Sequence, residues 1–512
     1  MTTFGALDTT IVVVYLALSV GVGLIANRFI TGLSGYLVAG RSLGTALSIA
    51  TMTGSELGLI TVMYQAQKGF TGGFAALHIG LIAGIVTLAV GLTGFIVVGL
   101  RRSEVMTIPE YYERRFDKET RVLGGILLAL GGILNMGLFL QVGSQFVVGV
   151  TGIDGNLLSA VMVGLLLLVL FYTVMGGMVS VVLTDYVQFV VLSLGLIALV
   201  LVTINTLGFD HIVEVMRTTR GEESFDPTAE FGGSYIAWMG VMGLVSCAVW
   251  PTAVTRALAS KNVSVVKRQF SFSAISFMIR FLLPCFLGIA AFVFISDAGG
   301  LILSDTSGIT GFQLEGGEAQ SSIMALPTFF RQVLPVGVLG LLTAAMLAAF
   351  MSTHDSYLLC WSSVIARDII APLIPSQSSP EKQLKWTRVF IVLIGIYVLF
   401  WGLFYHPSQD VWEYLGITGA VYFTGAIVVL SAGLYWPKAS SMGARLSLYA
   451  GLSAIVGLGP VKRALGLDAY TAPQIGLCTL AFAIFVMVVG SLAFPDPPSL
   501  SEELTATDPE SL

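Results

Sequence analysis

A run of polar residues, 352–356, interrupts one of the long apolar segments of this chain. Polar side chains at the depth of a bilayer cost free energy unless they face protein, water or an ion. At 3.6 residues per turn, Ala349, Ser352 and Ser356 share one helix face, and Thr353 flanks that face. Hydroxyl and carboxylate oxygens are hard ligands that suit a small cation rather than a soft metal. The segment therefore predicts a Na+ site inside a membrane helix, as in an ion-driven transporter.

A second polar cluster lies at the centre of the apolar segment 42–67. Its members are small or polar residues where a lipid-facing helix would carry Leu and Val: Thr51, Thr53, Gly54, Ser55, Glu56 and Gly58. Such a cluster predicts a helix that is unwound near its middle and exposes backbone carbonyls. The segment 234–260 carries Ser246 and Pro251 at a similar depth, and proline breaks the helical hydrogen-bond ladder. We therefore expect two interrupted helices with the binding site between them.

Ionisable residues within the apolar segments are further candidates for function. Arg280 needs a partner, which is either a solute carboxylate or an internal acid such as Glu56 or Asp355. Glu56 is a candidate to tune Na+ affinity, to bind a substrate amine or to pair with Arg280, and the alternative is a protonated, backbone-bonded glutamate. His78 either faces the cavity between the interrupted helices or is a packing residue.

Composition sets the class of the protein. Of 512 residues, 55% are hydrophobic and only 11% are charged, whereas soluble proteins carry about 25% charged residues. Repeated apolar runs of roughly 20 residues predict an all-α polytopic membrane protein with about 13 transmembrane helices. We expect no enzyme, and the net charge of -5 gives no reason to expect nucleic-acid binding. The predicted parts are a leading helix at 7–27, repeat one at 42–207, repeat two at 234–436, trailing helices at 440–495 and a disordered cytoplasmic tail at 496–512.

The Lys and Arg residues between the predicted spans indicate the orientation. With the N-terminus outside, 18 of them fall in inner loops and six in outer loops. Cytoplasmic loops carry the excess of positive charge. The sequence therefore predicts a multi-pass protein of the plasma (inner) membrane, with its N-terminus outside and its C-terminus in the cytoplasm.

Four stretches resemble the sodium/solute symporter family, which includes the proline, sialic acid and glucose symporters. Residues 36–43 (YLVAGRSL) are similar to the start of its first core helix, and residues 108–117 (IPEYYERRFD) to its inner loop after the second. Residues 172–188 match its glycine pair followed by Thr-Asp-x-x-Gln, and residues 344–368 resemble its eighth core helix. The four stretches occur in the family's order.

The resemblance implies a LeuT-like five-plus-five inverted repeat with one leading and two trailing helices. It also implies a main Na+ site between the first and eighth core helices. By position, its ligands are the carbonyls of Gly54, Leu57 and Ala349 and the hydroxyls of Ser352 and Thr353. The alternative is that each hydroxyl bonds the carbonyl four residues earlier in its own helix.

In sialic acid symporters, the residue that corresponds to Asp185 helps to hold a second Na+. The resemblance therefore makes Asp185, Asp355 and Ser356 candidates for a second ion site, although Asp355 replaces a hydroxyl. A structural role for Asp185, paired with a cation of an inner loop, is the alternative. The substrate candidates are Glu56, Gly58, His78, Arg280, Ser246 and Cys247, of which Ser246 and Cys247 replace the family's aromatic gates.

We conclude from the sequence that the chain is a secondary active transporter. The expected activity is Na+-coupled symport of a small polar solute (an amino acid, a carboxylate or a sugar-like molecule) by alternating access in a lipid bilayer. An H+-coupled transporter that uses Asp355, Asp185 or Glu56 is the first alternative. A transporter-like sensor that acts through a partner protein is the second, and a channel is the third. The expected state is a monomer or a weak oligomer.

Overall fold

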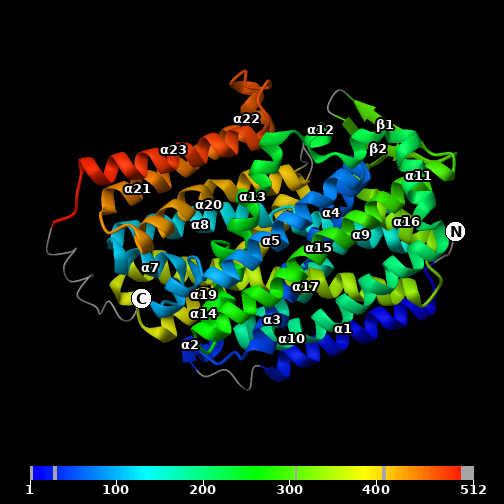
Figure 1. The fold of residues 1–512 in the computed structure, drawn as a ribbon. Helices are drawn as coiled ribbons and strands as arrows, with labels where there is room; N and C mark the ends of the chain where they lie inside the picture. Colours follow the sequence, from blue (N-terminus) through cyan, green and yellow to red (C-terminus); the bar gives the residue numbers. More distant parts are fainter. Residues whose placement is uncertain (1–3, 27–31, 306–307, 406–410, 498–512) are drawn as a thin grey trace.

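The computed structural model of the chain describes residues 4–26, 32–305, 308–405 and 411–497 (Figure 1). Most of these residues lie in helices that run roughly along one long axis of the molecule. The helices of the first half are α1 (Ala6–Ala26), α2 (Gly32–Val38), α3 (Thr45–Glu56), α4 (Leu59–Gly72), α5 (His78–Thr93), α6 (Val97–Arg102), α7 (Ile108–Arg115), α8 (Lys118–Met136), α9 (Phe139–Thr151), α10 (Leu158–Leu207), α11 (Phe209–Arg220) and α12 (Pro227–Phe231). Those of the second half are α13 (Gly233–Ala248), α14 (Pro251–Ala259), α15 (Val263–Asp297), α16 (Ala325–Val333), α17 (Val338–Val364), α18 (Ala371–Leu373), α19 (Pro380–Phe404), α20 (Val411–Tyr435), α21 (Ser441–Gly451), α22 (Gly459–Ala464) and α23 (Ala472–Ala493).

The predicted polytopic α-helical class is confirmed. Nine helical segments within the described residues are long and apolar enough to cross a membrane, whereas the count of 13 spans stays a prediction. Peripheral helices present apolar side chains outward, since Leu194 of α10, Phe400 of α19 and Phe485 of α23 are each more than half exposed. In contrast, α17 and α20 are almost enclosed by other helices. The polar residues of α17 therefore face protein rather than lipid.

Both expected helix interruptions are present. Between α3 and α4 the backbone leaves the helical conformation at Leu57 (ψ 63°) and Gly58 (ψ 160°). Between α13 and α14 it becomes extended at Trp250 (ψ 125°), immediately before Pro251. The residue before a proline is biased away from the α conformation, and proline suits the first turn of the helix that follows. The α10 helix also departs from helical geometry at Gly177 (φ 49°).

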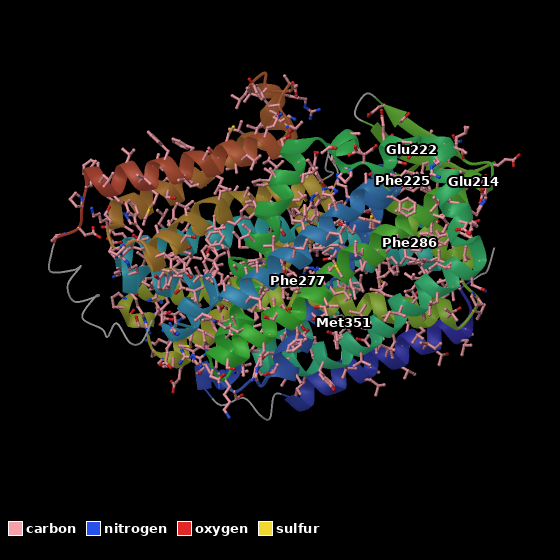
Figure 2. The ribbon with its side chains drawn as sticks, viewed as in Figure 1. Glu214, Glu222, Phe225, Phe277, Phe286 and Met351 are labelled. Atoms are coloured by element: carbon pink, nitrogen blue, oxygen red, sulfur yellow. The ribbon has the colours of Figure 1, made fainter. Side chains whose placement is uncertain are left out.

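Two polar regions between the long apolar helices, 208–233 and 298–335, contain regular secondary structure. The first contains α11 and α12, and the second contains α16 and a three-stranded antiparallel sheet in the order β1-β2-β3. The strands are β1 (Leu301–Asp305), β2 (Gly308–Gln313) and β3 (Gln320–Ser321). Figure 2 places Glu214 and Glu222 near this sheet at one end of the molecule, whereas Phe277 and Met351 lie among the central helices.

The two ends of the described chain lie at opposite ends of the bundle (Figure 1). In the first turn of α1, the Asp8 carboxylate accepts hydrogen bonds from the backbone N–H groups of Gly337 and Gly340, both at 2.7 Å. It thereby satisfies free donors at the start of α17. Most of the tail predicted to be disordered, residues 498–512, lies outside the described residues. Within the described part of the tail, Asp496 accepts a hydrogen bond from the Ser441 backbone N–H at 3.0 Å.

Candidate ion and solute site

The break between α3 and α4 lies against the middle of α17. The Ser352 hydroxyl donates a hydrogen bond to the Gly54 carbonyl at 3.2 Å, across the two helices. A Cβ atom at Gly58 would run into the Thr353 hydroxyl. Glycine is therefore required at this position for the close approach. Carbonyls at the broken helix and hydroxyls on the facing helix are thus brought together, as expected from the sequence.

Ser352 and Thr353 differ in their present hydrogen bonds. Thr353 donates to the Ala349 carbonyl at 3.0 Å, four residues earlier in its own helix. Ser352 does not bond to its own helix in this way, because it donates to Gly54 and to the Asp185 carboxylate. Both side chains are buried. The alternative of purely local hydrogen bonds therefore describes Thr353 but not Ser352.

The Asp185 carboxylate, on α10, joins α3 and α17 to the second interrupted helix. Its Oδ2 accepts a hydrogen bond from Thr51 Oγ1 at 2.6 Å and forms an ion pair with Arg256 Nη2 at 3.2 Å. The same Arg256 nitrogen donates to Ser356 Oγ at 2.7 Å. Ser356 in turn donates to Asp355 at 3.3 Å. Asp185 therefore does have a cationic partner: Arg256, one of the 18 cations counted for the inner loops, is buried in α14.

A second buried ion pair lies beside the α3–α4 break. Arg280 Nη1, from α15, contacts Glu56 Oε2 at 2.9 Å and the Glu56 carbonyl at 3.0 Å. The other carboxylate oxygen of Glu56 accepts a hydrogen bond from Thr252 at 2.6 Å. The guanidinium carbon of Arg280 lies 3.8 Å from the ring centroid of Phe277 and 4.6 Å from that of Phe281. Glu56 thus provides the internal acid that Arg280 was expected to need.

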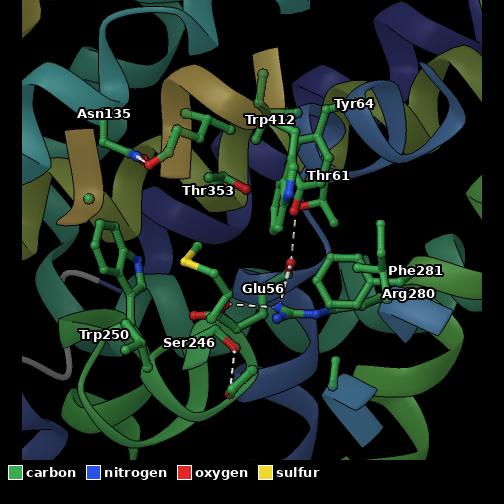
Figure 3. A pocket seen from close by; sticks show the side chains of 18 of the residues that line it. Glu56, Thr61, Tyr64, Asn135, Ser246, Trp250, Arg280, Phe281, Thr353 and Trp412 are labelled. Atoms are coloured by element: carbon green, nitrogen blue, oxygen red, sulfur yellow. Dashed lines mark hydrogen bonds and ion pairs between the residues drawn. The ribbon is translucent and has the colours of Figure 1, made fainter. Parts of the chain in front are cut away.

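These groups border a cavity of about 820 Å³, which includes space open to solvent (Figure 3). Its polar lining residues include Ser55, Glu56, Thr61, Asn135, Ser246, Arg280 and Thr353, and its aromatic ones include Tyr64, Phe139, Trp250, Phe281, Tyr357, Trp412 and Phe423. The Trp250 indole N–H donates to the Tyr357 hydroxyl at 2.8 Å. Because Thr353 also borders the α3–α4 break, the cavity adjoins the expected ion site directly.

Three substrate candidates are not among the residues that line this cavity: Gly58, His78 and Cys247. Gly58 packs against Thr353. His78 Nδ1 donates a hydrogen bond to the Ala75 carbonyl at 2.6 Å, and Ala75 does not line the cavity. Its ring packs against Phe231 and Tyr235, with centroids 5.3 and 5.8 Å apart. The contacts of His78 are those of the packing alternative.

Sequence reasoning missed several residues of the site. Thr252 and Arg256 bond the two carboxylates, yet both lie near the predicted end of a span, where charge and hydroxyl groups are common. Their i, i+4 spacing directly after Pro251 was the available signal, because it places them on one face of the helix that follows the break. Asn135 gave no such signal, since it is a single polar residue in an apolar segment.

Comparisons with known proteins agree with this architecture. The family model described as "Sodium:solute symporter family" matches residues 36–451. The sodium/glucose cotransporter of Vibrio parahaemolyticus is 25% identical over 87% of this chain and 84% of its own length. The sodium/pantothenate symporter of Haemophilus influenzae is 26% identical over 86% of this chain and 88% of its own length.

A solved structure of a substrate-bound, outward-open Na+-coupled sialic acid symporter superposes with a TM-score of 0.77. It is 21% identical, and the match covers 96% of this chain and 99% of that one. At this identity the likeness shows the fold alone, and it confirms the expected LeuT-like architecture. Together with the family match, it identifies Na+, rather than H+, as the coupling ion. The chain belongs to the sodium:solute symporter family and is a multi-pass membrane transporter that performs Na+-coupled symport of a small solute.

Proposed function

We propose that the coupled Na+ ion binds where the α3–α4 break faces α17. Its ligands are the carbonyls of Gly54, Leu57 and Ala349 and the hydroxyls of Ser352 and Thr353. The observation that carries this proposal is the hydrogen bond from Ser352 to the Gly54 carbonyl, because it brings a hydroxyl and a carbonyl from two different helices together in a buried place. Such oxygen atoms are the ligands that a hard cation prefers.

The solute binds in the adjoining cavity, where polar and aromatic side chains are mixed. The Glu56–Arg280 pair offers both signs of charge at its wall. Arg280 Nε is buried and has no hydrogen-bond partner among the described residues, so pairing with Glu56 does not use every donor of this guanidinium. These features favour a small polar solute, such as an amino acid, a carboxylate or a sugar-like molecule. The relatives named for glucose, myo-inositol and pantothenate agree with that class.

Coupling between ion and solute binding follows from Thr353, which belongs to both the proposed ion site and the solute cavity. Its hydroxyl is an ion ligand in this proposal, and its side chain also lines the solute cavity. A bound ion would draw the hydroxyl away from the Ala349 carbonyl and fix the α3–α4 break against α17, which shapes the cavity wall. Alternating access then arises from movement of the two repeats, 42–207 and 234–436, about the common site.

The excess of Lys and Arg in the predicted inner loops supports an N-terminus outside the cell and a cytoplasmic C-terminus, in the plasma (inner) membrane. The two ends of the described chain lie at opposite ends of the bundle, which agrees with an odd number of spans.

The test is a double variant, Ser352→Ala with Thr353→Ala. In the purified transporter, Na+ stabilises the folded state by mass action, so the thermal midpoint is recorded against NaCl, with choline chloride keeping the ionic strength constant. We expect the half-saturating Na+ concentration of the variant to rise about tenfold or more. A tenfold rise corresponds to a loss of about 1.4 kcal/mol of binding free energy.

The matched control is Ser362→Ala with Ser363→Ala, two adjacent hydroxyls on the same helix that bond to carbonyls of their own helix at 3.1 and 2.8 Å. The control should leave the Na+ dependence unchanged. If the first double variant also keeps the wild-type Na+ dependence, the assignment of these ligands is wrong.

A further inference from the structure

The Asp185 carboxylate is already fully provided with partners by the protein itself. Thr51 and Ser352 donate hydrogen bonds to it, and Arg256 forms the ion pair. Asp185 and Arg256 are 0% and 1% exposed, and Ser356, the second partner of the guanidinium, is 2% exposed. The cluster therefore combines one carboxylate with several hydroxyls, as a buried cation site does. The cation in this cluster is the guanidinium of Arg256.

We propose that Arg256 is a built-in cation that fills a second cation position, so that this transporter binds one Na+ ion per chain. This inference rests on the proposed Na+ site. Arginine keeps its positive charge in proteins and does not dissociate as an ion would. A second Na+ at the same hydroxyls would have to share the Asp185 carboxylate with a fixed positive charge a few ångströms away, and like charges repel strongly where water is scarce.

The position of Arg256 connects this cluster to the main ion site. Ser352 bonds to both the Gly54 carbonyl and Asp185. With its proton directed to the carboxylate, the Ser352 oxygen can present its lone pairs to the main Na+ ion. Arg256 holds the carboxylate in place for this role, and is therefore a positioning residue for the main site as well as a substitute for a second ion.

Arg256 and Ser356 also line a separate cavity, together with Thr107 and Ile108 from the start of α7. That segment belongs to a predicted inner loop. The guanidinium thus lies between the main ion site and this cavity, along the side from which Na+ leaves in the proposed orientation. A fixed positive charge there disfavours a second resting place for Na+ on its way out.

The experiment counts bound Na+ on the purified full-length transporter with ²²Na+ as the probe, without any solute. We expect saturation at one ion per chain with a Hill coefficient of about 1. In Arg256→Thr, which removes the guanidinium and adds a hydroxyl, we expect two ions per chain and a Hill coefficient that rises towards 2. Arg256→Lys retains a cation and should stay at one ion.

Two bound ions in the wild type, held with help from Asp355, would overturn the inference, as would one ion in a folded Arg256→Thr variant. If that variant does not fold, the wild-type count alone decides, since one ion supports the inference and two contradict it. Absence of any bound ion in the wild type would instead contradict the proposed main site, and this inference with it. Thr353→Ala alone, in the thermal assay above, distinguishes that failure, because Thr353 bonds to the Ala349 carbonyl rather than to Asp185.

Discussion

The two buried ion pairs of this transporter have the same chemistry but different surroundings. Glu56 and Arg280 line the solute cavity, and the guanidinium packs against two phenyl rings. Asp185 and Arg256 are enclosed by hydroxyl groups. In the proposed function, the first pair can exchange a contact for a solute group, whereas the Asp185 carboxylate of the second is already bonded to Thr51, Ser352 and Arg256. We therefore expect the surroundings, rather than the charges, to distinguish the pair beside the proposed solute cavity from the pair beside the proposed ion site.

The two pairs also connect the interrupted helices in a similar way. Thr252 and Arg256, one turn apart on α14, contact Glu56 and Asp185 respectively. The segment after the second break thus holds a carboxylate on the first interrupted helix and a carboxylate on α10. In the proposed mechanism, movement of α14 would therefore affect the proposed ion site and the solute cavity together.

The largest expected effect is that of Asp185→Asn, which breaks the enclosed pair. It leaves the Arg256 guanidinium, which is only 1% exposed, without its counter-charge. Breaking a buried pair in this way costs about 3–5 kcal/mol, so we expect a strong loss of thermally stable, monodisperse protein. The double variant Asp185→Asn with Arg256→Gln removes both charges and should recover much of that stability. If Asp185→Asn were as stable as the wild type, Arg256 would not depend on Asp185 for its counter-charge.

A smaller effect is expected for Arg280→Gln, because the cavity lets water or a solute reach the unpaired Glu56. We expect a loss of about 2–3 kcal/mol of stability, with Glu56→Gln as the compensating second change. The informative readout is binding: a screen of small carboxylates by thermal shift should lose its hits in Arg280→Gln if the guanidinium meets a solute carboxylate. Hits that persist in the folded variant would limit Arg280 to pairing with Glu56.

The smallest effect is expected for Gly58→Ala, which alters the contact between the helix break and α17 without changing any charge. The added methyl group pushes against Thr353, and overpacking of this kind costs about 1–3 kcal/mol. We expect weaker Na+ binding, measured as a higher half-saturating concentration in the thermal assay. Gly240→Ala on α13 is the matched control, since its new methyl group would meet no atom within 4 Å. If the two variants have the same half-saturating Na+ concentration, Gly58 does not contribute to the ion site.

Much of the fold could be predicted from the chain itself. Long apolar segments define membrane helices because a bilayer demands about 20 apolar residues per span. The breaks at Gly58 and before Pro251 were visible because glycine and proline weaken the interior of a helix. The polar run 352–356 was visible because such residues are costly in lipid. Each of these signals is local and does not depend on distant parts of the chain.

Only the tertiary structure decided which ionisable side chains pair with one another. The sequence left Arg280 a choice between a solute carboxylate, Glu56 and Asp355, and left Asp185 a choice between an ion and an unspecified cation. Contact between residues 224 and 71 positions apart depends on how helices pack, which no local pattern encodes. The same packing placed Arg256 against Ser356 and kept His78 out of the cavity lining. The sequence thus determined which groups must find partners within the membrane, and the packing of the helices determined which partners they found.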